Sequence, residues 1–171
     1  MNPTTVRLPP LLVAAVLLHI AVLPQFRVFG VAADVLVLAG VAAGVAGGPE
    51  RGALVGFACG LLADCFLQTP FGLTALVLTL VSWGVGAFQT RIVHVIWWIP
   101  MLTMAVGAAA TVVGYAILGA VMGEDHLIST HLLVVAAVVG VLDGLVGPLA
   151  VRAMRWALDV DHRGAIVLGA R

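Results

Sequence analysis

Charged residues are scarce in this chain, and their scarcity constrains the fold more than any other feature. Eight arginines and eight acidic residues are the only formally charged groups among 171 residues, and 63% of the chain is apolar. A soluble domain typically has about 25% charged residues, which cover its water-facing surface. The sequence therefore excludes a soluble globular domain, a disordered chain and a nucleic-acid-binding protein with a basic patch.

The apolar residues form six long runs, which predict an all-α integral membrane protein built as a bundle of six transmembrane helices. One span needs about 20 apolar residues, so six spans use about 120 residues and leave no room for a separate soluble domain. We expect a single membrane domain over residues 1–171. Its predicted helices cover about 8–25, 29–48, 52–68, 71–89, 97–122 and 128–151, and a short cytoplasmic tail covers 152–171.

The first apolar run follows Arg7, and we interpret it as a retained helix rather than as a cleaved signal peptide. Pro9 and Pro10 then stand in its first turn, where proline is tolerated. The breaks between the runs are short and contain glycine, proline or charged residues, as loops do. Neighbouring helices are therefore expected to form antiparallel hairpins.

Arginine placement predicts that both termini are cytoplasmic. With six spans, the termini and the second and fourth loops share one side of the membrane. That side carries seven of the eight arginines, namely Arg7, Arg51, Arg91, Arg152, Arg155, Arg163 and Arg171. The positive-inside rule assigns such a side to the cytoplasm. The same topology places four tryptophans at the cytoplasmic interface, where aromatic belts lie: Trp83, Trp97, Trp98 and Trp156.

A row of glycines marks the third predicted helix. Gly52, Gly56 and Gly60 recur every four residues, and Asp64 continues the row. Residues four apart share one face of a helix, and glycines on a face allow another helix backbone to approach closely in a bilayer. Two interpretations remain open here. Either the groove packs within the bundle, or it docks the transmembrane helix of a partner.

Four ionisable residues lie inside the predicted spans, where such groups usually mark a function or a packed polar contact. His19, Asp34 and Asp64 come from three consecutive helices and fall at one depth, roughly 6–9 Å below the outer surface. Asp143 lies nearer the middle of its helix. The three outer groups form either a polar pocket open to the outside or separately solvated groups near the interface. No close ligand spacing predicts a metal site, and a proton or sodium path would need Asp143 to connect to the others.

The sequence predicts neither an enzyme nor a cofactor. It contains no Gly-x-Ser-x-Gly, no His-Glu-x-x-His and no P-loop. Two intramembrane aspartates invite comparison with lipoprotein signal peptidases, whose motifs place an asparagine beside the catalytic aspartate. This chain has no asparagine after Asn2.

The stretch from Arg51 to Leu76 resembles the core of the MreD family of rod shape-determining membrane proteins. It has a glycine-rich helix ending in Gly-Leu-Leu-Ala-Asp64, a short turn with Thr-Pro-Phe-Gly-Leu, and then a new helix. Asp34 followed by Val-Leu-Val-Leu is also similar to the second helix of that family, although Ala33 stands here instead of a proline. The resemblance carries over five residues as partner-binding or packing positions: Gly56, Gly60, Asp64, Pro70 and Gly72.

The resemblance implies a multi-pass protein of the bacterial inner membrane with no catalytic activity. MreD-like proteins bind MreC, a bitopic membrane protein. Through MreC they are linked to the RodA glycosyltransferase, its transpeptidase partner and the MreB cytoskeleton. The implied role is a scaffold that helps to organise lateral peptidoglycan synthesis and cell shape.

The alternative is the substrate-binding subunit of an energy-coupling-factor vitamin transporter, because MreD-like proteins resemble the fold of these subunits. Such subunits often carry Ala-x-x-x-Ala on their first helix, where they meet the coupling subunit. The first helix here has Ala14, Ala15 and Ala21, and no two of them are four apart. That spacing disfavours the transporter.

Overall fold

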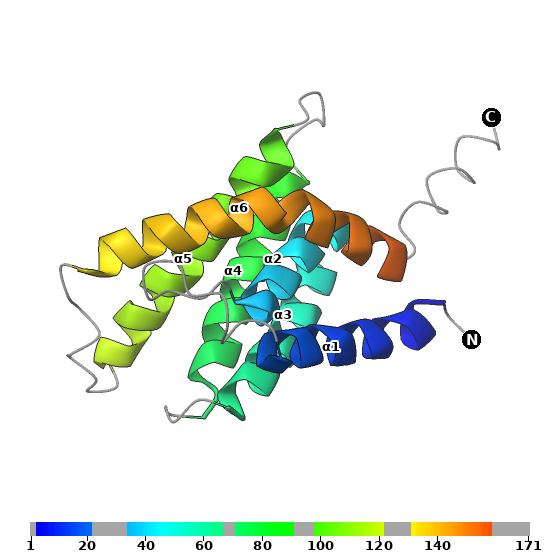
Figure 1. Cartoon of the computed structure of the whole chain (residues 1–171), viewed down its shortest axis with the longest axis horizontal. Coiled ribbons are helices and arrows are strands. Elements are labelled where there is room, and N and C mark those ends of the chain that lie inside the picture. Colours follow the sequence, from blue (N-terminus) through cyan, green and yellow to red (C-terminus); the bar gives the residue numbers. More distant parts are fainter. Residues whose placement is uncertain (1–2, 22–33, 67–70, 91–97, 122–130, 159–171) are drawn as a thin grey trace.

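The structure is a computed structural model, and it describes residues 3–21, 34–66, 71–90, 98–121 and 131–158. The described residues form six α-helices and adjoining turns, with no strand among them, so the predicted all-α class is confirmed. Figure 1 shows their arrangement. The helices are α1 (Pro3–Ala21), α2 (Val35–Gly47), α3 (Pro49–Asp64), α4 (Leu73–Gln89), α5 (Ile99–Val121) and α6 (His131–Ala157).

Local sequence signals explain where the central helices begin. Asp34 caps α2, since its carboxylate accepts hydrogen bonds from the first backbone N–H groups of the helix. Gly48 has a φ of 81° and separates α2 from α3, and Pro49 then starts α3 at a position that needs no N–H donor. Gly48 is thus the whole connection between two antiparallel helices.

Helix α2 is the centre of the bundle and contacts all five other helices. Ten of its 13 residues are buried. Among them, Leu36, Val41, Ala42 and Ala43 have no exposed surface. A helix that is apolar on every side suits this place, because each of its faces meets another helix. The tightest pairs around it are sequence neighbours, α3 with α4 and α5 with α6.

Several predicted helix boundaries are wrong, including both ends of α3, which was predicted at 52–68 and covers Pro49–Asp64. Helix α1 begins at Pro3, before the predicted start at residue 8, so Pro9 and Pro10 lie inside the helix. Pro3 can start a helix itself, which explains the earlier beginning. Helix α6 continues through residues 152–157, which were assigned to the tail. Met154 and Ala157 are buried, and this packing stabilises the last turns.

Within the described residues, two helices are long and apolar enough to cross a membrane, Ile99–Val121 and Leu132–Ala157. Helices α2 and α4 are apolar but have only 13 and 17 residues. A helix of 13 residues is about 20 Å long, which is shorter than a bilayer core of about 30 Å. Large apolar side chains are nevertheless exposed on the outer helices, including Leu54, Leu80, Val121, Leu133 and Leu149.

Candidate functional site

The glycine row of α3 is filled by α4 of the same chain. A Cβ added at Gly60 would lie 2.4 Å from the Cα of Ala75, and one added at Gly56 would lie 2.7 Å from the carbonyl oxygen of Leu78. At Gly52 a Cβ would also approach a carbonyl oxygen of α4, at 2.7 Å. The two backbones are therefore in direct contact along this row, and the groove offers no space for a helix of a partner.

A second row of close contacts sets the register of α2 against α4. Successive neighbours are Gly40 with Leu78, Gly44 with Ser82, and Gly48 with Gly86. Each step is four residues in both helices, so α2 and α4 run parallel. Extending this register toward the start of both helices places Asp34 level with Gly72.

Asp64 joins the end of α3 to the start of α4. Its Oδ2 accepts hydrogen bonds from the backbone N–H groups of Gly72 at 2.9 Å and Ala75 at 3.2 Å, and its Oδ1 accepts one from the N–H of Thr74 at 3.1 Å. These donors are at the start of α4, which lacks a capping side chain of its own. A carboxylate there also interacts favourably with the helix dipole. Asp64 is 3% exposed, so the structure assigns it to this cap.

Gly72 allows the backbone conformation of the turn before α4. Its φ is 98°, in the left-handed region that side chains with a Cβ rarely adopt, and it is the N-cap residue of α4. Its N–H is also the closest donor to Asp64. Pro70, which the resemblance also singled out, lies outside the described residues.

Asp34 and Asp64 each cap a different helix, and only the extended register of α2 and α4 places them at a similar level. The Oδ1 of Asp34 accepts hydrogen bonds from the N–H groups of Leu36 at 2.9 Å and Val37 at 3.4 Å. The third member of the predicted outer pocket, His19, belongs to α1, and its side chain lies outside the described part of the structure. Helix capping is thus a structural function that accounts for both described carboxylates.

Asp143 on α6 lies within electrostatic reach of Asp34, although the two residues are far apart in the sequence. The charge of Asp34 is close enough to act electrostatically on Asp143 and on Cys59 of α3. Asp143 lies near the middle of α6 and has no exposed surface. Neither of its oxygens accepts a hydrogen bond from any residue in the described ranges. The relative position of α2 and α6 depends on tertiary packing, and no sequence motif records it.

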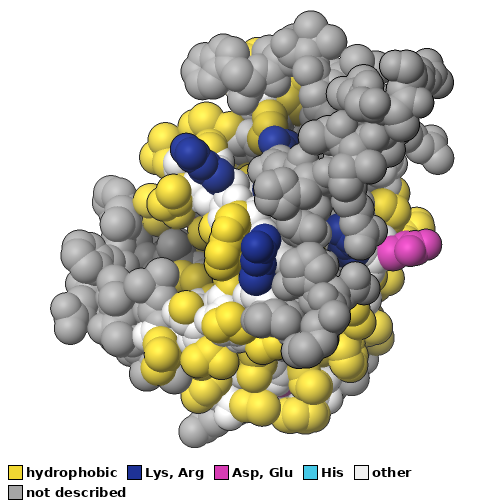
Figure 2. All heavy atoms as spheres, turned by 90° about the vertical axis from the view of Figure 1, so that its right-hand side faces the viewer, with side chains coloured by type: hydrophobic (Ala, Val, Ile, Leu, Met, Phe, Trp, Pro, Cys, Tyr) yellow, Lys and Arg dark blue, Asp and Glu magenta, His cyan; other side chains and the backbone are white. Residues whose placement is uncertain are grey.

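Arginines gather where α1 begins and α6 ends. An Nη of Arg7 donates to the carbonyl of Trp156 at 3.4 Å, and its guanidinium lies 5.1 Å from the centre of the Trp156 ring. An Nη of Arg51 donates to the carbonyl of Leu158 at 3.1 Å. Both guanidinium groups thus meet the negative end of the α6 dipole. Figure 2 shows arginines among apolar side chains on this face of the molecule.

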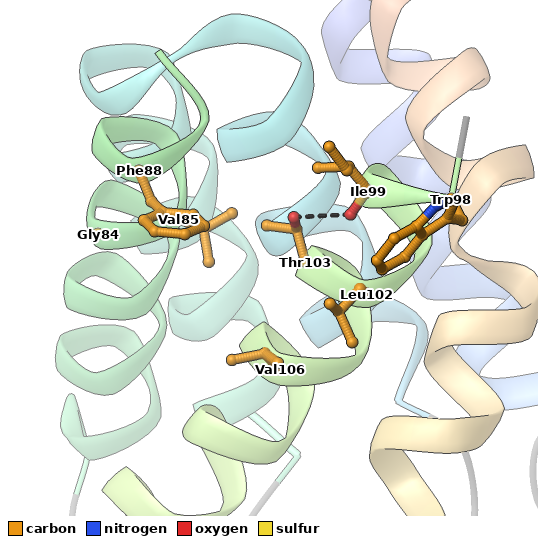
Figure 3. A pocket seen from close by; sticks show the side chains of 8 residues that line it. All are labelled: Gly84, Val85, Phe88, Trp98, Ile99, Leu102, Thr103 and Val106. Carbon is orange, nitrogen blue, oxygen red and sulfur yellow. Dashed lines mark hydrogen bonds between the residues drawn. The ribbon is translucent and has the colours of Figure 1, made fainter. Parts of the chain in front are cut away.

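An apolar groove of about 450 Å³ lies between α4 and α5. Figure 3 shows its lining: Gly84, Val85 and Phe88 from α4, and Trp98, Ile99, Leu102, Thr103 and Val106 at the start of α5. The Thr103 hydroxyl donates to the carbonyl of Ile99 at 2.8 Å, so it is not available as a free polar anchor. A second apolar groove, of about 350 Å³, lies between α1, α2 and α6.

Among the described residues, no three His, Cys, Asp or Glu side chains are grouped so that they could hold a metal ion. No protein-family model, curated protein sequence or solved structure matches the chain.

Proposed function

We propose that the protein is a non-catalytic scaffold that lies within a membrane and binds a single-span partner. More specifically, we propose that it is a member of the MreD family in the bacterial inner membrane. There it would bind an MreC-like bitopic protein and connect it to the RodA glycosyltransferase, its transpeptidase and MreB.

The observation that carries this proposal is the folding of the MreD-like stretch as one unit. Its glycine-rich helix packs backbone to backbone on the helix that follows its turn. The aspartate that ends the first helix caps the second, and Gly72 makes the turn between them. Gly56, Gly60, Asp64 and Gly72, the described residues among those carried over by the resemblance, thus all take part in joining α3 to α4. The exposed apolar side chains of the outer helices also support a membrane environment, because soluble monomers rarely expose large apolar patches.

We propose six spans with both termini in the cytoplasm. The contacts of Arg7 with Trp156 and of Arg51 with Leu158 support this topology, because they join the starts of α1 and α3 to the end of α6. With six spans, these three helix ends share the cytoplasmic side. Helices as short as α2 then require local thinning of the bilayer.

The two cysteines allow a direct test of orientation. Cys65 is exposed at the end of α3, whereas Cys59 is buried. We expect a membrane-impermeant maleimide to label Cys65 in cells whose outer membrane has been permeabilised and whose inner membrane is intact. In a Cys65→Ser background, Arg152→Cys at the opposite end should label only after the inner membrane is opened. Labelling of Arg152→Cys before Cys65 would contradict the proposed topology.

We propose the groove between α4 and α5 as the place where the partner helix binds. The glycine rows are filled by helices of the same chain, so a partner must use an outer surface. This groove is apolar, and Gly84 is one of its lining residues. In lipid, helices associate mainly through close packing, and a glycine in the contact surface allows a second helix to approach closely.

Gly84→Leu tests this assignment. A Cβ at Gly84 meets nothing within 4 Å, so the larger side chain should enter the groove without disturbing the bundle. We expect it to reduce co-purification with an MreC-like partner at least tenfold in mild detergent. Ala137→Leu introduces the same side chain on an exposed position of α6 and should not change recovery. Equal recovery with both variants would exclude the groove, and recovery of a vitamin-transport coupling subunit without any elongation protein would overturn the proposed function.

A further inference from the structure

Asp143 is the one aspartate among the three central ones whose carboxylate has no described hydrogen-bond donor. Asp64 accepts three backbone N–H groups, and Asp34 accepts two. Asp143 accepts none, and its side chain is fully buried. A buried carboxylate without a partner is costly in any protein and more so inside a membrane. A group that neutralises its charge is therefore needed.

Within the described part of the chain, the charged group that acts on Asp143 is another carboxylate. Asp34 on α2 acts on it electrostatically, and Asp34 in turn acts on Cys59 of α3. From α5, the neighbours of the adjacent Gly144 are Met101 and Ala105, which cannot ionise. Two like charges in a region of low dielectric repel each other strongly. A small cation between or beside them would remove this repulsion.

Helix α6 also has a backbone carbonyl without its helical donor, one residue after Asp143 in the sequence. Pro148 lies inside the helix and has no N–H, so the carbonyl of Gly144 lacks its usual helical donor. Carboxylate and carbonyl oxygens are the ligands that hard cations use in proteins. The Asp143 carboxylate and the Gly144 carbonyl are thus suited to a hard cation and poorly suited to an anion or a soft metal.

We propose that Asp143 is the binding group of a buried site for a small monovalent cation, either a sodium ion or a proton, beside the start of α2. The site does not depend on the proposed scaffold function. Its occupancy would stabilise the contact of α6 with α2, since the cation removes the cost of an isolated charge at this contact.

Thermal unfolding of the full chain in detergent, followed by tryptophan fluorescence, tests the site. If sodium binds, replacing choline chloride by sodium chloride at constant ionic strength should raise the unfolding temperature of the wild type. The rise should be about 5–10 °C at a sodium concentration of about a hundred times the dissociation constant. Asp143→Asn, which is neutral and of equal size, should not respond to sodium.

If a proton occupies the site, sodium should have no effect, but the wild type and Asp143→Asn should respond differently to pH. The neutral acid is the form that suits the buried site. Its contribution to stability is therefore present at low pH and lost as the pH rises. The unfolding temperature of the wild type should then fall progressively below that of Asp143→Asn. The measured quantity is the difference in unfolding temperature between the two proteins.

Ser82→Ala is the matched control, because Ser82 is also fully buried with an unpartnered oxygen but lies on α4 and carries no charge. It should respond to sodium and pH as the wild type does. If Asp143→Asn does not fold, Asp143→Ser serves as the second variant. Identical responses of the wild type and the Asp143 variant to both sodium and pH would overturn the proposal and leave a bound water as the partner of Asp143.

Discussion

Replacement of Gly60 by leucine is expected to force α3 away from α4 and to destabilise the protein by about 3 kcal/mol or more. Even the first carbon of the new side chain would lie 2.4 Å from the Cα of Ala75 and 2.7 Å from its nitrogen. These are backbone atoms, so no rotamer change relieves the overlap. Unfolding in mixed micelles, followed by circular dichroism, should occur at a lower fraction of sodium dodecyl sulfate than for the wild type. The variant should also accumulate to a lower level in the membrane.

Gly84→Ala is the matched control for this prediction. Gly84 is a helical glycine of α4, but a Cβ there meets no atom within 4 Å. Alanine also has a higher helix propensity than glycine, by about 1 kcal/mol. The control should therefore be as stable as the wild type or slightly more stable. If Gly60→Leu unfolded at the same detergent fraction as this control, the close approach of α3 and α4 would be refuted.

Asp64→Ala is expected to produce the second large loss of stability, again about 3 kcal/mol or more. Three backbone N–H groups at the start of α4 would lose their acceptor, and a hydrogen bond to a charged group contributes about 1.5–3 kcal/mol. Asp64 is buried, so water does not easily replace it. The same detergent titration measures the loss, and hydrogen exchange should become faster at the amides of Gly72, Thr74 and Ala75.

Two further substitutions define the cause of that loss. Asp64→Asn keeps one acceptor oxygen and should fall between the wild type and Asp64→Ala. Glu50→Gln removes an exposed carboxylate from the first turn of α3 and should cost less than about 1 kcal/mol. A loss from Asp64→Ala no greater than that from Glu50→Gln would show that the α4 cap does not depend on Asp64.

Much of the fold could be predicted because apolar runs and their breaks are local features of the sequence. The number and order of the described helices follow from such runs. The connections at Gly48 and Gly72 follow from residues with special backbone preferences. The glycine face of α3 was also visible in the sequence, but its partner was not. Only the three-dimensional contacts show that α4 occupies it.

The remainder could not be predicted because it depends on how distant helices lie against each other. The length of α2 depends on where Asp34 caps it, and the prediction had started that helix at residue 29. Asp143 was placed apart from the other polar groups, since spacing along the chain does not show that α6 packs against α2. The α4–α5 groove likewise is lined by side chains of two helices together, and neither helix has a sequence signature for it.

The bonds at the arginine-rich end have a consequence for the order of assembly. The tightest helix pairs join sequence neighbours, and local contacts of this kind form quickly because little chain entropy is lost in closing them. The Arg51–Leu158 bond joins residues 107 positions apart, and the Arg7–Trp156 bond joins residues 149 apart. Hairpins can therefore form while the chain is still being synthesised, whereas the bundle closes only when the last turn of α6 has emerged.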